Sequence, residues 1–143
     1  MKLLITCSLF FFLLCSCSVR PQEIYYGQDA CHFCSMTIVD KQHAAQIVTN
    51  KGKVYKFDAV ECMVDHLSDN TTPIAHYLVT DYNQPERLIN AKTATFIISP
   101  NIPSPMSANL SALSSLEEGQ IIKTSKEGDL YSWDELLIEI NKK

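Results

Sequence analysis

An apolar run near the N-terminus limits how much of this chain can fold as a globular domain. Residues 3–14 carry no charged side chain and follow a single lysine, Lys2. The run is about as long as the hydrophobic region of a secretory signal peptide, and it is too short to span a bilayer as a helix. We therefore expect residues 1–16 to be a cleaved signal peptide.

The end of this run, Leu14-Cys15-Ser16-Cys17, resembles the bacterial lipobox. In a lipobox a branched apolar residue and two small residues precede the cysteine that is acylated after cleavage. Cys17 fits that place, whereas Cys15 would follow the bulky Leu14 directly. We expect an exported lipoprotein anchored by its lipid, in the outer membrane facing the periplasm, with residues 17–28 as a lipidated tether. A plain signal peptide is the alternative.

The six cysteines divide according to this expectation. Cys7 and Cys15 leave with the signal peptide, and Cys17 takes the lipid. The three that remain are Cys31, Cys34 and Cys62. Three thiols in an oxidising compartment cannot all pair within one chain, so at least one is free, metal-bound or buried as a small apolar residue.

The charge balance and the missing motifs restrict the function. The formal net charge is −4 at pH 7, and it becomes more negative when Lys2 leaves. An acidic chain without a basic cluster is not expected to bind nucleic acid. The sequence has no Gly-x-Ser-x-Gly motif and no glycine-rich phosphate loop, and its acidic residues are scattered. We therefore expect a binding protein and no enzyme.

Apolar patterning predicts an α+β fold that begins after the tether. Residues 43–49 and 53–57 are typical of two strands joined by a turn, and residues 74–80 of a third strand. Between them, residues 60–67 place apolar side chains at helical spacing. The first unit, residues 29–84, therefore has the order strand, strand, helix, strand, and it includes a Cys-x-x-Cys-x-Met segment.

The predicted helix carries two further patterns near its start. Asp58, with Glu61 three residues later, matches a capping box. Cys62 and His66 are four residues apart and should therefore lie on one side of the helix.

A second α+β unit is predicted over residues 85–143. A polar link around residues 81–87 precedes a strand at residues 93–99 and a proline-rich loop, residues 100–105, that delivers Met106. A second capping box, Ser115 with Glu118, opens a helix, and a terminal helix that includes Trp133 completes this unit.

A short repeat connects the two units. Gly52–Asp58 (GKVYKFD) and Gly128–Asp134 (GDLYSWD) share one pattern that leads from a strand into a helix. Seven positions also fit chance convergence. We favour an internal duplication, which predicts two small related ββαβ-like units packed as one compact domain with a cleft between them, and Phe57 and Trp133 at equivalent buried places.

Four kinds of site are compatible with the stretch CHFCSM, residues 31–36. A thiol oxidoreductase motif follows a strand and opens a helix, and both are missing here. A bare disulfide between Cys31 and Cys34 would close a very small loop. A structural zinc site would use Cys31, Cys34, Cys62 and His66, which have knuckle-like spacing.

Copper(I) is the fourth possibility, and it explains more of the sulfur atoms. It is a soft ion that thiolate, thioether and imidazole ligands satisfy. Cys34 and Met36 are two residues apart, so an extended segment points both to one face. Met106 would reach the same ion from the other unit, across the cleft.

Several segments resemble the NosL family of nitrous oxide reductase accessory lipoproteins. They are CHFCSM near a lipobox, FDAVECM, SPMSANLSAL and GDLYSWDEL. The family's Cys-x-x-Cys-Gly-Met pattern maps onto Cys31, Cys34 and Met36, and its Pro-Met-Gly pattern onto Met106. Ser35 and Ser107 stand where the family pattern has glycine.

This resemblance implies a Cu(I)-binding lipoprotein that delivers the ion in the periplasm to the copper centre of nitrous oxide reductase. The implied ligands are Cys34 as the thiolate anchor, Met36 and Met106 as thioethers, and Cys31 as an assisting thiolate. The client enzyme and its assembly proteins would be the partners. A zinc-stapled binding module remains the alternative, with Cys62 and His66 as its additional ligands.

Overall fold

The computed structural model describes residues 18–142, so the predicted signal peptide and Cys17 lie outside the described part. Seven strands form one mixed sheet with the order β2-β1-β3-β6-β5-β7, and β4 pairs with β3 away from that path. The strands are β1 (Ala45–Thr49), β2 (Val54–Phe57), β3 (Ile74–Asp81), β4 (Gln84–Asn90), β5 (Thr95–Ile98), β6 (Leu110–Leu113) and β7 (Asp129–Tyr131). The helices are α2 (Val60–Ser68), the 3-10 turn η2 (Ala91–Thr93), α3 (Leu116–Lys126) and α4 (Trp133–Ile140).

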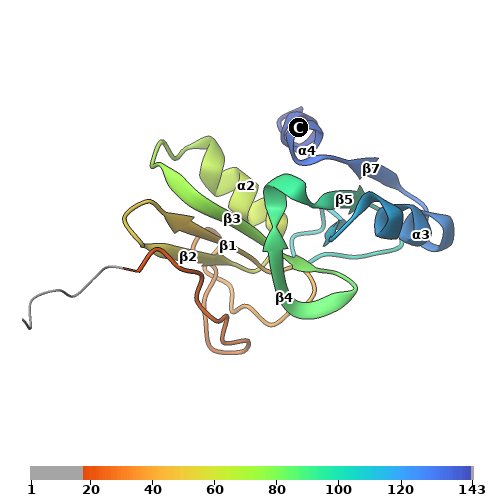
Figure 1. Cartoon of the computed structure of the whole chain (residues 1–143). Coiled ribbons are helices and arrows are strands. Elements are labelled where there is room, and N and C mark those ends of the chain that lie inside the picture. Colours follow the sequence, from red (N-terminus) through yellow and green to blue (C-terminus); the bar gives the residue numbers. More distant parts are fainter. Residues whose placement is uncertain (1–17, 143) are drawn as a thin grey trace, which may run out of the picture.

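The α+β class is confirmed. The strands of the first half of the chain lie at one end of the sheet, and those of the second half lie at the other end (Figure 1). In the first half β1 pairs antiparallel with both β2 and β3. In the second half β5 pairs antiparallel with both β6 and β7. A single parallel register pair, Asp81 with Ala112, joins β3 to β6. The two halves therefore share one sheet.

The prediction of two related units is not confirmed. Both copies of the short repeat lead from a strand into a helix, β2 into α2 and β7 into α4. Phe57 is the last residue of β2, whereas Trp133 is the first residue of α4. Both side chains are buried, but they do not hold equivalent positions within their elements.

Strand β4 occupies the segment that the sequence analysis treated as a polar link. Its residues pair antiparallel with β3, for example Leu88 with Thr80 and Asn90 with Leu78. The strand was missed because Gln84 to Arg87 are exposed and polar and include Pro85, so no apolar alternation marks them.

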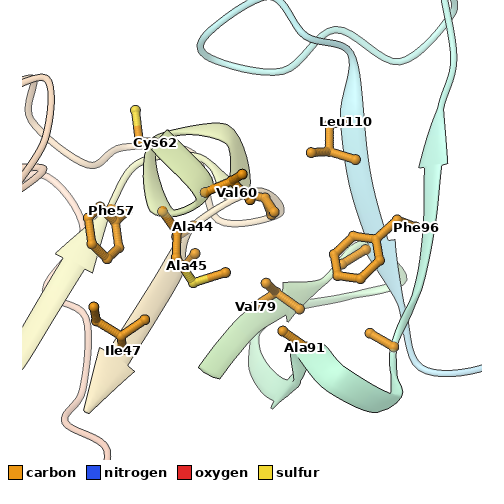
Figure 2. Close-up of a cluster of buried hydrophobic side chains, with 14 of the residues drawn as sticks. Ala44, Ala45, Ile47, Phe57, Val60, Cys62, Val79, Ala91, Phe96 and Leu110 are labelled. Carbon is orange, nitrogen blue, oxygen red and sulfur yellow. The ribbon is translucent and has the colours of Figure 1, made fainter. Parts of the chain in front are cut away.

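One main hydrophobic core spans both halves. The largest of its fully buried side chains include Phe57, Ile47, Met63, Phe96, Leu110 and Leu136. In Figure 2 Phe96 of the second half lies near Val79 and Ala91, Leu110 lies above Phe96, and Cys62 lies at the other end of the cluster. The Cys62 sulfur points away from the labelled core side chains in this view.

The described chain begins beside the turn between β1 and β2. A side chain at Gly52, which has φ +80°, would come within 3.2 Å of the Ser18 carbonyl oxygen. Glycine therefore fits both the turn and the close approach. Within residues 18–142, no helix combines the length and the apolar character needed to cross a membrane.

Candidate metal centre

The Cys-x-x-Cys segment forms a narrow hairpin that its own backbone holds in place. The Cys31 N–H donates to the Met36 carbonyl at 2.7 Å, and the Ser35 N–H donates to the Cys31 carbonyl at 3.0 Å. Ala30 and Thr37 form an isolated antiparallel bridge just outside the turn. Both cysteines of the segment are thereby presented from one short loop.

Asp58 and Cys62 approach this loop from the junction of β2 and α2. The predicted capping box of Asp58 and Glu61 is wrong: the N-cap residue is Ala59, and no side chain caps the helix. Asp58 Oδ1 instead accepts a hydrogen bond from Cys34 Sγ at 3.4 Å. The capping role is absent because the two carboxylates bind groups on distant loops.

Four side chains form a compact group of possible metal ligands: Cys31, Cys34, Asp58 and Cys62. Their sulfur and carboxylate ligand atoms all lie within 4.8 Å of one another. Cys34 is partly exposed, whereas the other three are buried. An ion would therefore enter and leave on the Cys34 side. Three sulfurs and one oxygen suit either a soft ion or zinc.

The thiols of this group differ in acidity. The Cys62 thiol hydrogen-bonds to Cys31, and this contact is the main cause that lowers the pKa of Cys31 to about 6. The same contact, together with burial, raises the pKa of Cys62. Burial also raises the pKa of Cys34. The lowered pKa favours the thiolate form of Cys31, whereas the raised pKa values favour the protonated thiols of Cys34 and Cys62.

The two predicted thioether ligands lie on exposed parts of two loops. Met36 directly follows the Cys-x-x-Cys turn and is 52% exposed. Met106 lies in the loop between β5 and β6 and is 38% exposed. Their coordination of an ion stays a prediction.

The loop of Met106 is attached to the first turn of α2. Glu61 Oε1 accepts a hydrogen bond from Ser104 Oγ at 2.5 Å and another from the Ala108 N–H at 3.3 Å. Glu61 immediately precedes Cys62 in the helix. Both loops that carry predicted ligands therefore converge on this helix turn.

His66 does not belong to the group, so the Cys3His set of the zinc alternative is not assembled. Its ring packs against the rings of His32 and Phe57, with centroids 5.1 and 5.4 Å away. Its Nε2 accepts a hydrogen bond from the Asn70 amide at 2.8 Å. Burial, reinforced by His32, lowers the pKa of His66, which favours the neutral ring. Asp58 supplies the fourth possible ligand atom in its place.

A second polar cluster lies inside the fold, with the arrangement of a Ser-His-Asp triad. His43 Nδ1 lies 2.9 Å from Asp40 Oδ1, and its Nε2 lies 3.0 Å from Ser111 Oγ. Ser111 is 0% exposed and His43 is buried. A substrate cannot reach that hydroxyl in this conformation, and we interpret the cluster as a structural network that satisfies buried polar groups.

Comparison with known protein families shows to which family the chain belongs. The NosL family model matches residues 23–140. The chain belongs to the NosL family. Among solved structures, the crystal structure of the copper chaperone NosL from Shewanella denitrificans has a TM-score of 0.71 at 22% identity, over 82% of this chain and 96% of that chain. That likeness shows a shared fold. No curated protein matches the chain.

Two serines of this NosL chain take the backbone conformation that glycine adopts most readily. Ser35 has φ +65° and Ser107 has φ +64°. They are the two positions at which the resemblance described above places glycine in the family pattern. The left-handed turns next to Met36 and Met106 are therefore formed here despite the side chains, at a cost of roughly 1–2 kcal/mol each.

Asp58 is the member of the group that the sequence analysis did not select. Its signal was its place four residues before Cys62, in the same FDAVEC segment. Because the capping-box pattern already accounted for Asp58, the sequence analysis did not consider this side chain as a ligand.

Proposed function

We propose that this NosL protein is a carrier that binds Cu(I) and passes it to a client copper enzyme. The observation that supports this most directly is the approach of three cysteine sulfurs, with ligand atoms within 4.8 Å, in one small group. The solved NosL relative is described as a copper chaperone. Cu(I) is soft and accepts two or three sulfur ligands, so such a group suits it.

The ligands we propose are Cys31, Cys34, Met36 and Met106, and the compact group adds Cys62 as a further thiol. Cys31 supplies the thiolate, because its pKa is already lowered. The exposed thioethers lie where a partner can reach them. A carrier needs both properties: it must hold the ion firmly and still release it to another protein.

The cell location and the client are further parts of this proposal. The lipobox-like end of the signal peptide supports lipidation at Cys17, export, and anchoring in the outer membrane facing the periplasm. Membership of NosL supports nitrous oxide reductase and its assembly proteins as partners. Mass spectrometry of the N-terminus tests the anchor, because an unmodified N-terminal residue other than Cys17 contradicts it.

A structural zinc site is the second candidate, and Asp58 is the observation that favours it. Its carboxylate lies within the group, and a carboxylate oxygen is a hard ligand that zinc accepts more readily than Cu(I) does. In this alternative the ion stabilises the fold and is not transferred.

Metal titration of the reduced mature protein, followed by circular dichroism, distinguishes the two functions. A carrier is folded without metal, binds about one Cu(I), and prefers it to Zn(II). Cys34→Ser then abolishes tight binding, whereas Met36→Ala and Met106→Ala weaken it without unfolding the protein. An apo-protein that is unfolded and folds only on addition of zinc contradicts the carrier function.

A further inference from the structure

Glu61 is a buried carboxylate that does not belong to the group of metal ligands. It lies in the first turn of α2 and is 6% exposed. Its Oε1 atom accepts hydrogen bonds from the hydroxyl of Ser104 and the N–H of Ala108. Those two donors stand two residues before and two residues after Met106. One oxygen atom therefore holds the loop on both sides of the methionine.

The loop is also closed across its base, so that little freedom remains. The Ser99 N–H donates to the Asn109 carbonyl at 3.0 Å, and the Ser107 N–H donates to the Ser104 carbonyl at 3.0 Å. Ser107 takes a left-handed conformation. The position of the Met106 backbone relative to α2 is thus set by the contacts of Glu61 and by this turn.

We propose that Glu61 is a positioning residue that places the Met106 thioether beside the thiol group, an inference that rests on the proposed copper function. Successive residues of an α-helix point about 100° apart around its axis. Glu61 therefore reaches the Met106 loop while Cys62 reaches the Cys-x-x-Cys loop. One turn of helix fixes the two ligand loops relative to each other.

The buried carboxylate of Glu61 lowers the stability of the fold, which an apolar side chain at this position would not do. Its second oxygen, Oε2, is buried without a hydrogen-bond partner among the described residues. A buried acceptor left unpaired lowers the free energy of unfolding, and an apolar side chain of similar size would not have this effect. What the carboxylate adds is an acceptor for two donors that flank one ligand.

A double-mutant cycle that measures Cu(I) affinity tests whether Glu61 positions Met106. The mature reduced protein competes for Cu(I) with a chromophoric chelator, and thermal melting of each apo-variant monitors the fold. We expect Glu61→Ala to weaken Cu(I) binding by roughly tenfold, as for other residues that orient a metal ligand. Glu61→Gln should bind normally, because its carbonyl oxygen can accept the same two hydrogen bonds.

The decisive comparison uses Met106→Ala as the background. If Glu61 acts through Met106, then Glu61→Ala adds no further loss of affinity when Met106 is already alanine. Equal losses with and without Met106 overturn the inference, as does a lower melting temperature with unchanged affinity. If Glu61→Ala does not fold, Ser104→Ala, which removes one of the two donors, takes its place in the same cycle.

The same measurements distinguish a failure of this inference from a failure of the proposed copper function. Loss of tight binding in Cys34→Ser, with normal binding in Met106→Ala and Glu61→Ala, overturns the positioning role and leaves the copper function intact. Unchanged Cu(I) affinity in Cys34→Ser overturns the copper function itself.

Discussion

The thiol of Cys34 donates a hydrogen bond to the carboxylate of Asp58 over 3.4 Å, between a loop and the start of a helix 24 residues further along the chain. Within the group, Cys34 is the one thiol that is partly exposed, and the Asp58 carboxylate is the one hard ligand. This contact joins the two. The identity of the ion therefore depends on whether Asp58 coordinates it or only orients Cys34.

Replacement of Asp58 by asparagine should separate the two ions. The amide keeps the size of the side chain but removes the negative charge, which contributes to Zn(II) binding far more than to Cu(I) binding. We expect Zn(II) affinity to fall roughly tenfold or more, with Cu(I) affinity nearly unchanged. Competition with chelators for each ion measures this. Asp65→Asn, on the same helix but outside the group, is the matched control and should affect neither ion.

The lowered pKa of Cys31 predicts a thiolate in the reduced apo-protein at neutral pH. Because this acid has a folded-state pKa of about 6 instead of 9.0, its thiolate should appear as the pH rises through about 6. Thiolate absorbance in the ultraviolet during a pH titration measures the midpoint. In Cys62→Ala the hydrogen bond is lost, and the midpoint should move toward 9.0. A wild-type midpoint that already lies there contradicts the assignment.

Glycine at Ser35 or Ser107 should stabilise the fold slightly. Each serine has a positive φ, which costs roughly 1–2 kcal/mol, whereas glycine loses only about 0.5–1 kcal/mol of conformational entropy. The free energy of unfolding, measured by urea denaturation, should therefore rise by up to about 1.5 kcal/mol. Ser125→Gly, in the last turn of α3, is the control and should lower it. A loss of stability at both loop positions would argue against backbone strain.

Alanine at Gly119 should destabilise the protein although it is the better helix former. An added Cβ would lie 2.9 Å from Thr95 Cγ2 and 3.2 Å from Leu130 Cδ2. Such overpacking costs roughly 1–3 kcal/mol, against a gain of about 1 kcal/mol in helix propensity. Urea denaturation measures the difference. The second substitution Thr95→Ser removes the nearest methyl group, and it should reduce the penalty of Gly119→Ala.

Local patterns predicted much of the secondary structure. The strands β1, β2 and β3 and the helix α2 follow from the spacing of apolar residues. The second predicted capping box is half formed: Ser115 accepts a hydrogen bond from the Glu118 N–H, whereas the Glu118 carboxylate accepts one from Ser114. β4 could not be predicted in this way, because its stability comes from pairing with β3 and not from a buried face.

The site was predicted less completely, for a related reason. The sequence predicted Cys31 and Cys34 as ligands and left Cys62 as an alternative, and the structure brings these three thiols together. It assigned Asp58 and Glu61 to a cap, because that pattern is local. In the structure each carboxylate is bound by a loop more than 20 residues away in sequence, Cys34 for Asp58 and Ser104 for Glu61. No local rule contains those partners.

Strand β2 also separates the start of the described chain from the thiols. Ser18 lies beside Gly52, at the turn that precedes β2, whereas Asp58 directly follows the last residue of that strand. Four residues of strand span roughly 13 Å. If Cys17 carries the proposed lipid, the anchor joins the described chain near the β1–β2 turn, and the thiol group lies at the other end of β2. A partner of the proposed carrier could then approach the thiol group without contacting the turn nearest the anchor.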